Sequence, residues 1–219
     1  MSDLLREIDE AVRADNMKRL WDEHKTALIA GVSALIIGTA IFSGWNAWQS
    51  KKNQEGTNRV IAALEAPKPV DALGKAAEEN SGNPKIIALL NEASLLLKSG
   101  QKDKALETYS LAQKTSSADR SLKDLATMQK VNLMLDIKPD VKADELLKEL
   151  SSVAENKKSP WQGEAIFMSA FIKGEKNKNF TEASDDLKKL AVREDVTTSL
   201  QQRARALQSV YDLKKAEKK

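Results

Sequence analysis

The pattern of apolar and polar residues divides the chain into an uncharged stretch near its start and a long amphipathic remainder. The stretch from Thr26 to Trp48 has no ionisable side chain. A helix of this length, about 23 residues, measures roughly 34 Å, which is enough to cross a hydrocarbon core of about 30 Å. Trp45 and Trp48 lie where the apolar run ends, a position typical of the lipid–water interface. The pattern therefore predicts a transmembrane anchor over 26–48.

Two other interpretations of this stretch stand beside the anchor. A cleavable signal normally has an apolar region of about 7–15 residues followed by small residues, whereas bulky indoles follow this run. A helix buried in a soluble core is usually shorter than this run. Small residues recur on one helical face of the stretch, which is typical of membrane helices that pack closely, although chance placement also explains them. These residues are Ala27, Gly31, Ala34 and Gly38.

Amphipathic patterns lie on both sides of the predicted anchor. Residues 1–25 have apolar side chains at helical spacing and predict a tail that lies on the lipid surface, docks on a partner or stays solvated. Residues 49–83 predict a stalk and a short helix, with a break at Pro67 and Pro69 because proline cannot continue a helix. We expect the main domain to span 84–219.

The main domain repeats a helical pattern and contains no alternating strand, which predicts an all-α fold. Asn83 with Pro84, and Ser159 with Pro160, predict two helix starts. The spacing Ala-x3-(Tyr/Leu)-x2-(Ala/Leu) resembles the second helix of a tetratricopeptide repeat. It predicts an α-solenoid of about three helix pairs, capped by a last helix at about 197–213. Its occurrences are Ala105/Tyr109/Ala112, Ala143/Leu147/Leu150 and Ala183/Leu187/Leu190.

The resemblance to tetratricopeptide repeats implies a concave groove along the first helix of the first pair. The residues at the corresponding positions are Ile87, Leu90, Ser94 and Leu97, of which three are apolar. Either the chain's own 70–79 helix covers this candidate groove, or the groove binds an apolar segment of another protein.

Composition excludes several classes of function. The chain has no cysteine, which excludes disulfides and thiolate metal sites. Its 35 basic and 32 acidic residues are interspersed, so no nucleic-acid footprint stands out. The single histidine, His24, has no partner for general-base catalysis, and the adjacent carboxylates Asp185 and Asp186 point apart on a helix. We expect no enzymatic activity, no cofactor, no metal and no small-molecule substrate.

The order of the parts is similar to that of one bacterial family. A tail SDLLREIDEAVRADNMKRLWDEH precedes an anchor ending in GWNAWQSKK, and SPWQGEAIFMSAFIKG and LQQRARALQSVY follow near the C-terminus. This order resembles the ancillary subunits of the SecYEG translocon, which are single-span, tetratricopeptide-repeat-like inner-membrane proteins of Gram-negative bacteria. The resemblance implies a cytoplasmic N-terminus, a periplasmic domain, and association with the translocon and with periplasmic chaperones. Flanking charges alone leave the orientation open.

The function predicted by this resemblance is a membrane-anchored protein–protein interaction module that links the Sec translocon to periplasmic chaperones or emerging chains. One alternative is an envelope, cell-division or stress-signalling scaffold that acts through its cytoplasmic tail. Another is a receptor whose repeats lie in the cytosol, as in organelle import. The family has no catalytic residues to carry over.

Overall fold

The computed structural model describes residues 46–216, and the chain divides into two compact units, 1–52 and 53–219. In the first unit, residues 46–52 are helical, and Lys52 Nζ lies 5.4 Å from the centre of the Trp48 ring. Among the residues that the structure describes, no helix combines the length and the apolar character needed to span a bilayer. The tail over 1–25, its His24 and the small-residue face of the predicted anchor lie outside the described residues.

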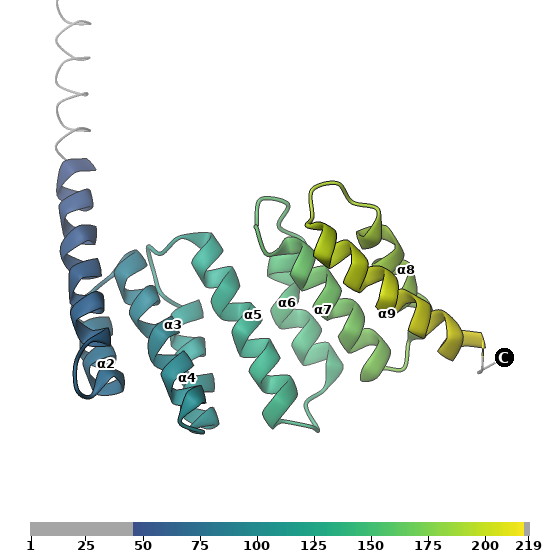
Figure 1. Cartoon of the computed structure of the whole chain (residues 1–219), viewed down its shortest axis with the longest axis horizontal. Coiled ribbons are helices and arrows are strands. Elements are labelled where there is room, and N and C mark those ends of the chain that lie inside the picture. The colour runs from purple at the N-terminus through teal and green to yellow at the C-terminus, as the bar shows by residue number, and fades with distance from the viewer. Residues whose placement is uncertain (1–45, 217–219) are drawn as a thin grey trace, which may run out of the picture. The chain divides into compact units, whose positions relative to one another are not determined.

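The second unit consists of helices joined by short connections in the part that the structure describes, as Figure 1 shows. A helical segment over residues 53–64 comes first. Each later helix packs against the next one, and α3 also contacts α5 while α7 contacts α9. The all-α prediction is confirmed for this unit. The helices are α2 (Pro69–Glu79), α3 (Gly82–Lys98), α4 (Lys102–Gln113), α5 (Arg120–Ile137), α6 (Ala143–Ala154), α7 (Gln162–Glu175), α8 (Phe180–Ala191) and α9 (Thr198–Ala216).

The repeated alanine-based pattern faces the core in α4, α6 and α8. In α4, Ala105 and Ala112 have no exposed surface and Tyr109 is 4% exposed. Small side chains at such positions let neighbouring helices approach closely, while the larger residue fills the space beside them. In α6 and α8 the corresponding residues are also buried, apart from Leu147, which is half-buried.

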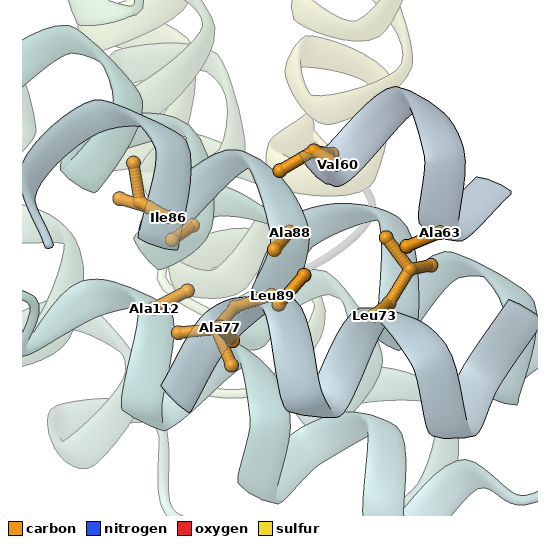
Figure 2. Close-up of a cluster of buried hydrophobic side chains, with 10 residues drawn as sticks. Val60, Ala63, Leu73, Ala77, Ile86, Ala88, Leu89 and Ala112 are labelled. Carbon is orange, nitrogen blue, oxygen red and sulfur yellow. The ribbon is translucent and has the colours of Figure 1, made fainter. Parts of the chain in front are cut away.

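The core also includes residues that precede α3. Val60 and Ala63 of the segment 53–64 and Leu73 of α2 belong to the same buried cluster as Ile86 and Leu89 of α3. Figure 2 shows these side chains gathered between their helices. The segment 53–64 and α2 thus form a further helix pair before the three pairs that the repeat pattern predicts. The division of residues 49–219 into a stalk and a main domain stays a prediction.

The last helix, α9, covers one end of the stack. Tyr211 of α9 is fully buried and its hydroxyl donates a hydrogen bond to the Phe171 carbonyl oxygen at 3.4 Å. The ring lies against Gly174, where a Cβ atom would come within 2.4 Å of Tyr211 Cζ. Lys214 Nζ lies 5.3 Å from the centre of the Phe180 ring and forms an ion pair of 3.0 Å with Glu175. This packing places α9 as the expected capping helix.

Of the two predicted helix starts, the one at Asn83 is wrong because its side chain binds elsewhere, and the one at Ser159 lies ahead of the observed helix. α3 begins at Gly82, and the Asn83 amide instead accepts a hydrogen bond from the Asp119 N–H at 2.7 Å, in the connection before α5. α7 begins at Gln162, two residues after Pro160. Residues 159–161 form a turn in which Ser159 Oγ accepts from the Trp161 N–H at 3.2 Å. The Asn83 contact fixes a connection, whereas the Ser159 contact is of the kind that an N-cap side chain makes.

Candidate interaction surfaces

The predicted groove residues Ile87, Leu90, Ser94 and Leu97 form a stripe along α3, called here the α3 stripe. All four side chains are half-buried. Ile87 and Leu90 pack at the edge of the cluster that contains Val60 and Leu73. Leu90 and Leu97 also lie at the edge of a second cluster, formed by α3, α4 and α5, together with Val70 of α2. The stripe is therefore partly covered and keeps an accessible apolar edge.

A cavity lies among α6, α7 and α8 and is called here the last cavity. Its volume is about 370 Å³, and its lining is largely apolar, with Leu147, Ile166 and Leu190 contributing from the three helices. Lys173 of α7 also lines it and pairs with Asp186 of α8 at 2.8 Å. The acidic neighbours Asp185 and Asp186 therefore differ in environment, because Asp185 is exposed. This geometry suits an ion pair and not a carboxylate dyad.

Between α4, α5 and α6 the corresponding space is occupied by a polar network. Lys130 Nζ of α5 lies 2.9 Å from Glu149 of α6 and donates a hydrogen bond of 3.2 Å to Gln113 of α4. The Gln113 amide donates to the second Glu149 oxygen at 3.0 Å. Burial raises the pKa of Glu149, but the hydrogen bonds from Lys130 and Gln113 and the nearby positive charges outweigh it and hold that pKa below its ordinary value.

Another cavity lies among α2, α3 and α4. It is called here the first cavity, because its helices come first in the chain. Its volume is about 460 Å³, and Gly74 and Glu78 of α2, Glu92 of α3 and Leu111 of α4 line it. Glu92 lies across the backbone of α2, since a Cβ atom on Gly74 would be 3.5 Å from Glu92 Oε1. Burial, followed by the charge of Glu78, raises the pKa of Glu92. The remaining lining residues are Ala77, Asn80, Ser81, Gly82, Lys85, Leu89, Lys114, Thr115 and Ser116.

Large apolar side chains are exposed on α7 and α9. Phe171 is 39% exposed, Val210 45% and Leu213 68%. Nearby, the Arg203 guanidinium lies 4.5 Å from the centre of the Phe167 ring and 3.1 Å from Glu164. Stacked cations and exposed large apolar side chains are common where proteins bind other proteins.

One carboxylate is buried without a full set of partners. Asp124 of α5 is 1% exposed, and the Arg120 Nε donates to its Oδ1 at 2.8 Å. The same guanidinium donates to the Ser152 carbonyl oxygen at 3.0 Å, which links α5 to α6. Asp124 Oδ2 has no hydrogen-bond partner among the residues that the structure describes. The arrangement joins two helices, and its carboxylate is closed to solvent, so we assign it to packing.

Sequence reasoning found the α3 stripe but missed both cavities. Cavity lining comes from three helices, and the sequence does not show which side chains of separate helices meet. The charges of Glu92, Lys130 and Lys173 are visible in the sequence, but several other charged residues on the same helices line neither cavity, so charge alone does not single them out. Among the described residues, no group of three or more histidine, aspartate or glutamate side chains is arranged to hold a metal ion.

Comparison with solved structures supports a tetratricopeptide-repeat-like fold. The chain is similar to a tetratricopeptide repeat protein from Parabacteroides merdae, with a TM-score of 0.56 and 14% sequence identity. The match covers 76% of this chain and 61% of that one, so the chain corresponds to less than two thirds of that protein's length. No family model and no curated protein matches the chain. At this identity the likeness shows the fold alone.

Proposed function

We propose that the protein is a membrane-anchored interaction module that associates with the Sec translocon and with periplasmic chaperones or emerging chains. The observation that carries the interaction role is the α3 stripe, which keeps an accessible apolar edge on a stack of helix pairs. Helix stacks of this kind present extended surfaces on which other proteins bind. The Sec-related part of the proposal rests on the resemblance of the whole sequence, from its tail to its last helix.

In this proposal the segment 26–48 is a single inner-membrane anchor, with residues 1–25 in the cytoplasm and residues 49–219 in the periplasm. Residues Ala27, Gly31, Ala34 and Gly38 are the face by which the anchor would pack against translocon helices. Anchoring raises the effective concentration of the domain near the translocation exit, so weak contacts are sufficient for binding. The activity is binding, with no chemical step.

Photocrosslinking from the α3 stripe tests the proposed function. A photoreactive amino acid replaces Leu90 or Leu97 in the full-length protein, expressed in Gram-negative cells and irradiated before lysis. Because the proposed partner segment lies on these side chains, we expect crosslinks to translocon subunits or periplasmic chaperones, identified by mass spectrometry. The same amino acid at Glu107, an exposed position of α4, is the control.

Two results contradict the proposal. One is the same set of proteins captured from position 107 as from positions 90 and 97. The other is capture of cytoplasmic proteins alone from positions 90 and 97, which would place the repeats on the opposite side of the membrane. Digestion of the domain by protease added to spheroplasts checks its location independently, because a periplasmic domain is accessible to that protease.

A further inference from the structure

Three successive triplets of helices carry a charged residue on their central member. In the triplet α4, α5 and α6, Lys130 of the central helix pairs with Glu149 of α6 at 2.9 Å. In the triplet α6, α7 and α8, Lys173 of the central helix pairs with Asp186 of α8 at 2.8 Å. In both triplets the central helix supplies the cation and an outer helix supplies the carboxylate.

The triplet α2, α3 and α4 has a different arrangement of charges. Its central helix carries Glu92 and its outer helix α2 carries Glu78, and both residues line the first cavity. Neither carboxylate has an ion pair or a side-chain hydrogen bond to any residue that the structure describes. Burial raises the pKa of Glu92, and the negative charge of Glu78 raises it further. In the described part of the chain, this triplet therefore lacks the ion pair between central and outer helix that the other two contain.

Two lysines line the first cavity, but neither forms an ion pair with Glu78 or Glu92 in the described part of the chain. Lys85 lies two helical turns before Glu92 on α3, which is about 10 Å along the helix axis. Lys114 lies at the end of α4, and its charge helps to lower the pKa of Glu149 in the neighbouring triplet. Neither lysine lies within 4.0 Å of Glu78 or Glu92 in the described part of the chain. The carboxylates remain available to a cation from outside the triplet.

The apolar part of the first cavity indicates the kind of cation. Leu111 borders the cavity from α4 with 53% of its surface exposed, and Leu89 and Ala77 contribute further apolar lining. A lysine or arginine side chain combines an aliphatic stem with a charged end, so it matches both features. Two carboxylates form too small a ligand set for a dedicated metal site, and no larger group of metal-binding side chains exists among the described residues.

We infer that the first cavity binds a partner segment that inserts a lysine or arginine side chain between α2 and α4. The cation lies between Glu78 and Glu92, and a neighbouring apolar residue of the partner covers Leu111. The inference rests on the proposed function as an interaction module and adds a second docking surface with a stated charge preference. This site is separate from the α3 stripe, because the two sets of residues occupy different faces of α3.

Peptide binding to the full-length protein in nonionic detergent tests the inference. The probe is a fluorescent alanine-rich helical peptide with leucines and lysines on one face, and a matched peptide has glutamates in place of the lysines. Fluorescence anisotropy measures both affinities. We expect binding of the lysine peptide only, weakening as salt is added. The double variant Glu78→Gln and Glu92→Gln should reduce that affinity about tenfold or more, whereas Glu107→Gln on the exposed face of α4 leaves it unchanged.

Thermal unfolding separates loss of the site from loss of the fold. Because burial and, to a smaller extent, the charge of Glu78 disfavour the charged form of Glu92, Glu92→Gln should raise the Tm at neutral pH while it lowers peptide affinity. A variant that merely damages the fold would lower both quantities. A higher Tm together with a lower peptide affinity is the result expected for a binding site that is retained at some cost in stability.

Three outcomes overturn the inference. They are equal binding of the lysine and glutamate peptides, unchanged affinity in the double variant, and binding that appears only after deletion of residues 2–20. The last outcome would identify residues 2–20 of the chain itself, which include Arg6, Arg13, Lys18 and Arg19, as the occupant. None of these outcomes removes crosslinks from positions 90 and 97, so the proposed function would stand. Conversely, loss of those crosslinks with intact peptide binding would contradict the proposed function and not the cavity.

Discussion

At the scale of single residues, the positions that matter most are those where helices approach too closely for another side chain. Gly163 and Gly174 of α7 are such positions, because a Cβ atom on Gly163 would lie 2.8 Å from Val196 Cγ1 and one on Gly174 would overlap the Tyr211 ring. The sequence places these glycines inside a helix, where glycine is intrinsically unfavourable. Close approach to α9 and its preceding connection explains them.

Gly174→Ala should destabilise the domain by about 1–3 kcal/mol, because the added methyl group meets the fully buried ring of Tyr211. The measurement is chemical unfolding of the full-length protein followed by circular dichroism. Gly74→Ala is the matched control, also a glycine inside a helix, where the new Cβ atom would be 3.5 Å from its nearest neighbour. That control should be neutral or stabilising by up to about 1 kcal/mol. Equal destabilisation by both changes would show that contact with the Tyr211 ring is not the reason for a glycine at position 174.

At the scale of helices, contacts between successive pairs hold the stack in register. Asn83 reaches the connection before α5, and the Trp161 indole N–H donates to the Ser121 carbonyl oxygen at 2.9 Å. These contacts join residues 36 and 40 positions apart, about one helix pair along the chain. The network of Gln113, Lys130 and Glu149 joins three helices in the same way.

The network on Glu149 predicts a pH dependence of stability. Because the pKa of Glu149 is lower in the folded protein than its ordinary value, the stabilisation is present above that ordinary value and is lost as the pH falls through the folded-state pKa. Glu149→Gln should therefore cost about 1 kcal/mol at neutral pH, and the difference from wild type should shrink on acidification. Urea unfolding at a series of pH values measures this difference in unfolding free energy.

The control for this experiment is Glu145→Gln, which changes an exposed carboxylate of the same helix α6. We expect it to leave the pH profile of the unfolding free energy parallel to that of the wild type. A Glu149→Gln difference that stayed constant from neutral to acidic pH would mean that the lost contact depends on packing and not on charge.

At the scale of the whole molecule, the proposed role depends on location more than on chemistry. In that proposal the repeats supply binding surfaces, and the predicted anchor supplies the place at which they act. The alternative role, a signalling scaffold, requires the cytoplasmic tail, whereas a translocation role centred on the domain does not.

Deletion of residues 2–20 distinguishes these two roles. If the domain carries the function, crosslinks from positions 90 and 97 to translocon subunits or chaperones should persist in the truncated protein, and the growth of a complemented deletion strain should be unchanged. Immunoblotting of membrane fractions checks that the anchor still inserts. Loss of function with normal insertion would favour the signalling scaffold.

Part of this protein was determined by local patterns in its sequence. The helical spacing of apolar residues, the alanines of the repeated pattern and the breaks at Pro67 and Pro69 predicted an all-α stack with a last helix over 197–213, close to the observed α9. Such features are predictable because each depends on neighbours within a few turns. The α3 stripe was found for the same reason, although what binds it stays a prediction.

The tertiary structure decided the features that depend on residues far apart in the chain. Asn83 looked like a helix cap, yet its partner Asp119 lies 36 residues further on, in a connection whose position the local pattern does not specify. The pairing of Lys130 and Lys173, and the absence of a described partner for Glu92, likewise depend on which side chains three separate helices bring together. The sequence shows which positions carry a charge, whereas the partner that neutralises each charge is decided only when the helices pack.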